Sequence, residues 1–317
     1  MENPINSITI STETEFLETL RLSNPVWNLS IPGDTNWINR EVWGFRGQSD
    51  ADWTLVPSAF RKNVTLGFKP ASKPPTLTPQ DQQNEERRTL NDFLFFADRI
   101  GLDVAGDGPI FRFPRLPGHP PKLDLSAWPW DMSLETLAIA QHHGVPTRLL
   151  DFTYDSLVAA FFACYDAWEK LGRPSYKDQN ITVEKMLAVW AVHLPLIYKS
   201  VAEYSRSNRN SRIILVTAPR SRNSYLHNQE GFFLIDLMAD KEKYPSLEKA
   251  IIDVRSEMIA SGLTQLSSPQ IIKIQFPWKR VPRMLALLWN EFYNIARMQP
   301  SLDKAVQALK DHRDLFS

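Results

Sequence analysis

Polar side chains that could do chemistry are concentrated in one stretch of the chain, residues 141–165. Its second half is an almost fully apolar run, from Leu157 to Tyr165, that predicts a buried helix. The residues just before that run are typical helix N-caps: Asp151, Thr153, Asp155 and Ser156. A helix that begins there points N–H groups and the positive end of its dipole at the preceding residues, which favours an anion. The polar candidates for such a site are Gln141, His142, His143, Thr147, Arg148, Asp151 and Thr153.

A second charged candidate, Arg46, lies in a predicted strand over residues 41–48, between Gly44 and Gly47. Glycine within a strand often marks the close approach of another part of the chain. Two interpretations of Arg46 stay open. It is either a structural ion-pair partner or a ligand-binding residue whose guanidinium group makes a bidentate contact with phosphate or carboxylate. If residues 147–151 are extended, Asp151 could pair with Arg46, and Arg148 would face the opposite way.

The histidines and glutamines near these positions also have alternative roles. His142 could act as a general acid or base, because an unperturbed imidazole titrates near pH 6.5; a hydrogen-bonded core histidine is the alternative. No acidic or histidine partner stands at metal-ligand spacing, so we expect no metal. The amides of Gln48, Gln141 and Gln229 could read a carboxamide such as that of nicotinamide, or they could cap adjacent loops.

The composition argues against several classes of protein. Lys+Arg and Asp+Glu are equal at 36 each, so the chain has no overall basic signature for nucleic acid. Its one cysteine, Cys164, excludes an internal disulfide framework and a cysteine-based zinc site. The first residues lack a signal-peptide pattern, and no apolar run approaches the ~20 residues of a membrane span. We therefore expect a cytoplasmic protein without a membrane contact.

One local segment departs from this neutral balance. Residues 205–222 contain five arginines and no acidic residue. They could form a solvated basic loop, or they could contact the phosphates of RNA or DNA.

The pattern of elements predicts an α+β fold, because strands and helices do not alternate regularly. Strands are predicted over residues 41–48, 186–193, 211–217, 230–237 and 271–276. Helices are predicted over residues 13–22, 84–100, 133–141, 157–171, 196–204, 247–260, 282–296 and 301–312. We divide the chain into a lead-in over residues 1–37, a main domain over 38–297 and a C-terminal helix over 298–317.

Three separated blocks resemble the FRG domain family. The first is W-G-F-R-G-Q-S-D at residues 43–50 with W-T-L-V-P-S-A-F-R at 53–61, and it contains Phe45-Arg46-Gly47. The second is A-Q-H-H-G-V-P-T-R-L-L-D-F-T-Y-D-S-L-V-A-A-F-F-A at 140–163, and the third is N-Q-E-G-F-F at 228–233. Glu85 or Glu86 fits the helix between the first two blocks. The resemblance implies a bacterial or phage-associated intracellular protein.

The order of these blocks is also distantly similar to ADP-ribosyltransferases of the arginine–serine–glutamate type. That similarity implies a mixed or antiparallel split sheet with surrounding helices. It also implies that Arg46 binds the phosphate or ribose of NAD, that residues 151–153 stand where a Ser-Thr-Ser strand would, and that Glu230 or Gln229 is catalytic. Asp151 and Thr153 replace the serines. Strand alternation would let only one of Gln229 and Glu230 face the site.

We therefore expect an NAD-using ADP-ribosyltransferase or NAD glycohydrolase, of the kind found among bacterial toxins and anti-phage effectors. NAD would be its substrate, with a protein or RNA as acceptor. Two alternatives remain: a non-catalytic module that binds a nucleotide or a protein, and a nucleic-acid-directed activity of the arginine-rich segment.

Overall fold

The fold is taken from a computed structural model. It describes residues 4–27, 42–61, 64, 66, 78–107, 128–129, 133–178, 180–206, 211–217, 228–239, 246–262 and 269–317.

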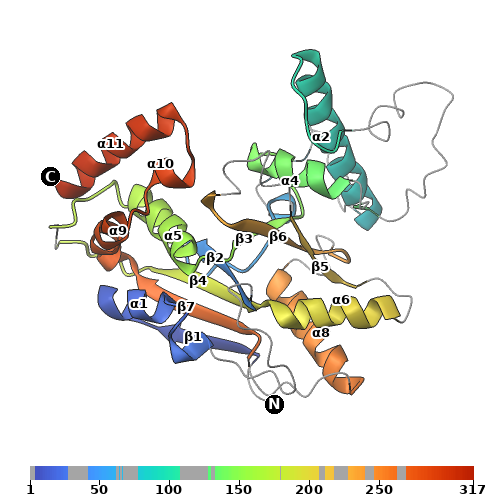
Figure 1. Ribbon diagram of the computed structural model, residues 1–317, viewed down its shortest axis with the longest axis horizontal. Coiled ribbons are helices and arrows are strands. Elements are labelled where there is room, and N and C mark those ends of the chain that lie inside the picture. Colours follow the sequence, from blue (N-terminus) through green and yellow to red (C-terminus); the bar gives the residue numbers. More distant parts are fainter. Residues whose placement is uncertain are drawn as a thin grey trace.

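A seven-stranded mixed sheet runs through the described part of the chain, in the order β1-β7-β4-β2-β3-β6-β5 (Figure 1). The β1–β7 pair is parallel, and every other neighbouring pair in this sheet is antiparallel. The strands are β1 (Ile5–Thr9), β2 (Trp43–Gln48), β3 (Leu150–Thr153), β4 (Met186–His193), β5 (Ile213–Val216), β6 (Gly231–Asp236) and β7 (Ile271–Pro277). The predicted mixed α+β architecture is therefore confirmed.

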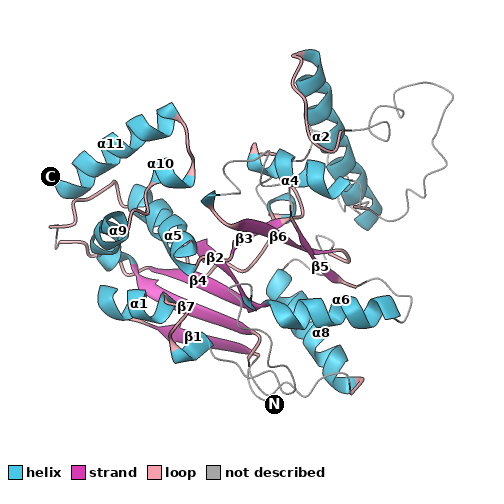
Figure 2. Ribbon diagram, viewed as in Figure 1, coloured by secondary structure: helices cyan, strands magenta, loops and turns pink. Residues whose placement is uncertain are grey.

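Helices surround this sheet (Figure 2). They are α1 (Glu13–Leu20), α2 (Pro79–Arg99), α4 (Leu134–His142), α5 (Ser156–Lys170), α6 (Leu194–Arg206), α8 (Leu247–Ala260), α9 (Val281–Asn290), α10 (Ile295–Met298) and α11 (Leu302–Phe316).

The largest differences between predicted and observed helices concern α2 and residues 282–296. Helix α2 begins five residues earlier than predicted, because Thr78 and Asp81 form a reciprocal capping box around Pro79. The single helix predicted over residues 282–296 is wrong. Helix α9 ends at Asn290, Phe292 adopts a left-handed backbone with φ of 66°, and α10 starts after the Asn294 cap.

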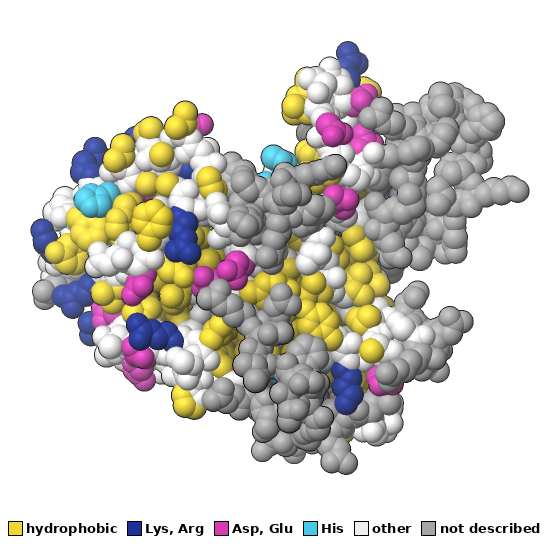
Figure 3. Space-filling model, viewed as in Figure 1, with side chains coloured by type: hydrophobic (Ala, Val, Ile, Leu, Met, Phe, Trp, Pro, Cys, Tyr) yellow, Lys and Arg dark blue, Asp and Glu magenta, His cyan; other side chains and the backbone are white. Residues whose placement is uncertain are grey.

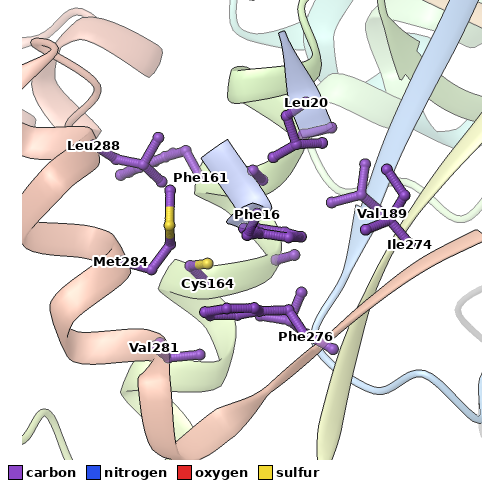
Figure 4. Close-up of a cluster of buried hydrophobic side chains, with 14 of the residues drawn as sticks. Phe16, Leu20, Phe161, Cys164, Val189, Ile274, Phe276, Val281, Met284 and Leu288 are labelled. Atoms are coloured by element: carbon purple, nitrogen blue, oxygen red, sulfur yellow. The ribbon is translucent and has the colours of Figure 1, made fainter. Parts of the chain in front are cut away.

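One face of the sheet carries two separate cores. The first packs α5, α9 and α1 against β2, β4 and β7, with Phe16, Phe161 and Phe276 among its buried side chains (Figure 4). The second packs α2 and α4 against β5 and β6, where Phe233 is buried. Residues paired across antiparallel strands point to the same face. The register Phe45–Thr153 and Asp151–Phe233 therefore puts Asp151 on this face, between the two cores.

The opposite face carries a third core. Helices α6 and α8 cover it, and it includes Trp190, Phe232 and Leu234. Helix α5 packs against β2 on the face of the sheet that carries the first core. A Cβ atom added to Gly47 would lie 1.9 Å from the carbonyl oxygen of Ala159, so this glycine permits the contact between strand and helix.

Candidate functional site

An ion pair between Arg46 and Asp151 connects strands β2 and β3. Strands β2 and β3 are in register at one pair of residues, Phe45 and Thr153. Beyond that pair, Arg46 connects the two strands. Its Nη1 donates to the carbonyl oxygen of Asp151 at 2.9 Å and lies 2.7 Å from Asp151 Oδ2. The Arg46 side chain is only 11% exposed, so the cation is held inside the protein.

The carboxylate of Asp151, in contrast, is open to solvent. Its side chain is 66% exposed, although Arg46 and Gln141 both hold the carboxylate in position. Besides the two contacts from Arg46, Gln141 Nε2 donates to Asp151 Oδ1 at 3.2 Å. The hydroxyl of Thr147 donates to Gln141 Oε1 and so orients that amide. The site thus presents an anchored carboxylate whose free side faces outward.

The charge of Asp151 is set mainly by its partner. Partial desolvation by the surrounding protein would raise the pKa of the Asp151 carboxyl, but the charge and hydrogen bond of Arg46 outweigh it and hold that pKa below its usual value. Asp151 is therefore ionised at neutral pH. A group with such a low pKa suits electrostatic stabilisation better than proton transfer.

Arg61 is a residue of the site that the sequence did not single out. It is exposed, and its charge interacts with those of Arg46 and Asp151. Desolvation and the nearby Arg46 cation lower the pKa of Arg61, which still remains a cation at neutral pH. Its Nε donates to the carbonyl of Val56 at 3.3 Å. The signal that could have found it is its position as the last residue of the block 53–61.

The start of α5 is not an open anion site. Asp155 is its N-cap: its Oδ1 accepts from the N–H groups of Leu157 at 2.8 Å and Val158 at 3.3 Å. Its Oδ2 accepts from the hydroxyl of Tyr293 at 2.8 Å. These N–H groups, which we expected to favour an anion, are thus occupied by a carboxylate of the chain itself. Thr153, another candidate, donates to the carbonyl of Gln229 at 2.6 Å and supports the turn before β6.

Gln229 and Glu230 lie in that turn and not in a strand, because β6 begins at Gly231. The prediction that strand alternation selects one of them is therefore wrong. Gln229 Nε2 donates to the carbonyl of Met298 at 2.9 Å, which fastens the turn to α10. Glu230 has a left-handed backbone with φ of 47°, and its carbonyl accepts from the N–H of Tyr154 at 3.2 Å. The turn thus lies beside the C-terminal end of β3, next to Thr153 and Tyr154, and not beside Asp151.

Arg148 and Gln48 lie away from the exposed carboxylate. Arg148 is 1% exposed, and its Nε lies 2.7 Å from Glu86 Oε2. Gln48 is buried, accepts from Trp190 Nε1 at 2.9 Å and donates to the carbonyl of Thr54 at 3.3 Å. Both side chains therefore connect elements inside the protein. Arg148 lies in a bend before β3, and its ion-pair partner is Glu86 of α2 and not Asp151.

Two further side chains that could titrate are His142 on α4 and Cys164 on α5. His142 ends α4 and its ring lies 5.3 Å from that of His143. Desolvation, together with the neighbouring His143, lowers the pKa of His142, so it is a neutral base at pH 7. Cys164 is fully buried in the first core, and burial raises the pKa of its thiol, which argues against a nucleophile. Across the described ranges, no group of three histidine, cysteine or acidic side chains could hold a metal ion.

The arginine-rich segment is described only in part. Arg212 is 8% exposed and pairs with Asp236 at 3.0 Å and with Asp253 at 3.0 Å. It therefore belongs to an internal ion-pair network instead of a basic surface. Residues 207–210 and 218–222 lie outside the described residues.

Comparison with known proteins identifies one family. Residues 119–170 match the model of the FRG domain family. This segment holds α4, β3 and α5, with the Gln141–Asp151 hydrogen bond inside it, whereas Arg46 and Glu230 lie outside the matched range. No curated protein and no solved structure matches the chain. Within the described part of the chain, no helix has the length and apolar character needed to cross a membrane.

Proposed function

We propose that the chain uses NAD as a substrate and cleaves its nicotinamide–ribose bond, as an ADP-ribosyltransferase or an NAD glycohydrolase. The observation that supports this proposal is the anchored and outward-facing carboxylate of Asp151. Arg46 and Gln141 fix it from behind, and 66% of its side chain remains exposed.

The chemistry needs a fixed negative charge. When the bond between C1′ of the ribose and the nicotinamide nitrogen breaks, the electron pair leaves with nicotinamide and the ribose becomes oxocarbenium-like. A preorganised carboxylate stabilises that developing positive charge. Water or an acceptor then attacks C1′ and loses a proton. Asp151, whose low pKa keeps it ionised, would supply the charge.

Arg61 is the better candidate for the diphosphate of NAD. Arg46 Nη1 is already paired with Asp151, so an anion would have to displace that carboxylate. Arg61 is exposed, and only its Nε is hydrogen-bonded to a residue in the described ranges. Two guanidinium groups beside one carboxylate leave one net positive charge in this region, which suits a ligand that carries both phosphates and ribose hydroxyls.

Glu230 would act at the acceptor side of the same ligand. Glu230 stands beside Tyr154, three residues beyond Asp151 along β3. At about 3.3 Å per residue, the two positions are roughly 10 Å apart. That separation fits a role in orienting or deprotonating the acceptor better than a role at the same atom. Gln229 would position this turn through α10, and His142 remains a candidate base.

The test is nicotinamide release from NAD by purified protein, with cell lysate as a source of protein and RNA acceptors. We expect release by the wild type, a loss of at least about 100-fold in Asp151→Asn, and a raised KM in Arg61→Gln. Asp166→Asn is the matched control, because Asp166 is also a half-exposed aspartate in an ion pair, with Lys170 at 2.6 Å. Wild-type protein that releases no nicotinamide, or an Asp151→Asn variant with full activity, would overturn the proposal.

The second candidate is a binding module without turnover. It is favoured by the hydrogen bonds that Thr153 and Gln229 make inside the protein, because catalytic side chains generally stay available to the substrate. Thermal unfolding with NAD and with ADP-ribose distinguishes the two candidates. A binding module would gain stability from the ligand in the wild type, lose that gain in Asp151→Asn, and release no nicotinamide.

A further inference from the structure

Helix α11 carries an unpartnered apolar stripe on its outer side. Leu302, Val306 and Leu309 are 88%, 52% and 73% exposed. Their spacing of four and three residues puts them on one face of the helix, over about two turns. Figure 3 shows exposed hydrophobic side chains over this helix, and Figure 1 shows α11 at the outer edge of the molecule.

The opposite side of the same helix is firmly attached. Asp311 is buried and accepts from Tyr165 Oη of α5 at 2.8 Å and from Arg173. The carbonyl of Leu315 accepts from the N–H of Tyr176 at 2.9 Å. The stripe is therefore displayed on a rigid element and not on a frayed end.

The charges beside the stripe identify the partner that fits it. Asp303 and Lys310 are seven residues apart, so they lie on the same flank of α11, one near each end of the apolar stripe. Neither forms an ion pair with a residue in the described ranges, and both are exposed. The sign of the charge thus reverses along this flank.

This pattern is self-complementary for one orientation. A two-fold axis perpendicular to α11 sets two copies of the helix antiparallel and brings the same flank of both together. Asp303 of each copy then faces Lys310 of the other, and Val306 lies near its own symmetry mate. A parallel pair would instead bring opposite flanks together and lose both charge pairs.

We infer that α11 is the contact surface of a two-fold homodimer, formed by antiparallel packing of α11 against α11 of a second copy of this chain. A single pair of short helices buries at most about 1,000 Å², the lower limit for a specific interface, so the dimer is weak and depends on concentration. The inference does not depend on the proposed NAD chemistry.

Sedimentation velocity of the full chain, from about 1 to 200 µM, tests this inference. We expect the wild type to dimerise within that range and Leu309→Glu to raise the dissociation constant at least about tenfold. Ile100→Glu is the control, since Ile100 is 72% exposed at the end of α2, away from this stripe. A wild type that stays monomeric, a Leu309→Glu protein that dimerises normally, or a dimer disrupted by Ile100→Glu would overturn the inference.

A charge exchange tests the orientation. Asp303→Lys and Lys310→Asp should each weaken dimerisation, because each juxtaposes like charges twice. The double variant Asp303→Lys/Lys310→Asp should restore it to within about threefold of the wild type. Both residues are exposed, so circular dichroism of each variant should match the wild type. Weakening that is additive in the double variant would overturn the antiparallel arrangement.

Discussion

Arg148 and Glu86 form a two-point ion pair in the interior of the protein, with Nε 2.7 Å from Oε2 and Nη2 3.0 Å from Oε1. Their side chains are 1% and 2% exposed. Trp128 and Gln82 donate to the same carboxylate, at 2.8 Å and 2.9 Å. This pair connects α2 to the segment that enters β3, and it thereby supports the end of that strand where Asp151 lies.

Glu86→Gln should therefore destabilise the protein strongly. It leaves the buried guanidinium of Arg148 without a counter-charge, which costs about 3–5 kcal/mol of unfolding free energy. Glu85→Gln is the matched control on the same helix, because Glu85 pairs with the exposed Arg88 at 3.2 Å and should change stability by less than about 0.5 kcal/mol. Urea unfolding of the two variants measures the difference, and equal effects would contradict the role assigned to Glu86.

Gly47→Ala should also be strongly destabilising. The new Cβ would lie 1.9 Å from the backbone oxygen of Ala159, so α5 would have to move away from β2. At Gly44 the nearest obstacle is 2.6 Å away and is the ring of Phe232, a side chain. We expect Gly47→Ala to cost more than about 3 kcal/mol and Gly44→Ala about 1–3 kcal/mol, measured by urea unfolding. The reverse order would show that α5 is free to shift.

His193 makes stability depend on pH. It is buried, its Nδ1 lies 2.9 Å from Gln270 Oε1, and desolvation lowers its pKa to about 4. An unfolded chain binds the proton near pH 6.5, so between pH 6.5 and 4 the unfolded state holds more protons than the folded state. Stability is complete above that window and falls as the pH is lowered through it, by about 2 kcal/mol at pH 5.

The comparison variant for this effect is His193→Gln, which cannot titrate. His142, whose pKa is also lowered, contributes in the same direction in both proteins, so the difference between them isolates His193. Urea unfolding at pH 7 and pH 5 should show a smaller loss for the variant. An identical loss would mean that another group carries the dependence.

Asp311→Asn should loosen α11 without unfolding the rest of the chain. The substitution removes the charge that pairs with Arg173 and the carboxylate oxygen that accepts from the Tyr165 hydroxyl, at a local cost of about 1–3 kcal/mol. Amide hydrogen exchange should become faster in α11 and remain unchanged in β4 and β7. Asp166→Asn, which alters an exposed pair on α5, serves as the control and should leave the exchange of α11 unaffected.

The sequence predicted elements well where local pattern decides them. Strand β4 and helix α8 have the predicted bounds, because each is a long apolar or amphipathic run. Strand β1 was not predicted, since its five residues are largely exposed and its place in the sheet comes from pairing with β7. The break between α9 and α10 depends on backbone conformation at Phe292, which no periodicity reveals.

The candidate site was predicted less completely, because its geometry depends on distant partners. The sequence offered Asp151 as a partner for Arg46, and the two do pair across 105 residues. It also offered Asp155 as one of four possible caps of α5, and Asp155 is the cap observed. It could not show that Arg148 is neutralised by Glu86, 62 residues away. Solvent exposure separates the side chains that can reach a ligand from those that cannot. Asp151 and Arg61 are exposed, whereas Gln48 and Arg148 are buried.

The parallel pairing of β1 with β7 has a consequence for synthesis on the ribosome. Ile5 pairs with Ile271, so β1 must wait for a partner made 266 residues later. At about 5–20 residues per second, that delay is roughly 15–50 s. Throughout this interval the residues of β1 have no neighbour in the sheet, and the growing chain completes its central strands first. The β1 edge of the sheet is therefore the last part of it that translation can close.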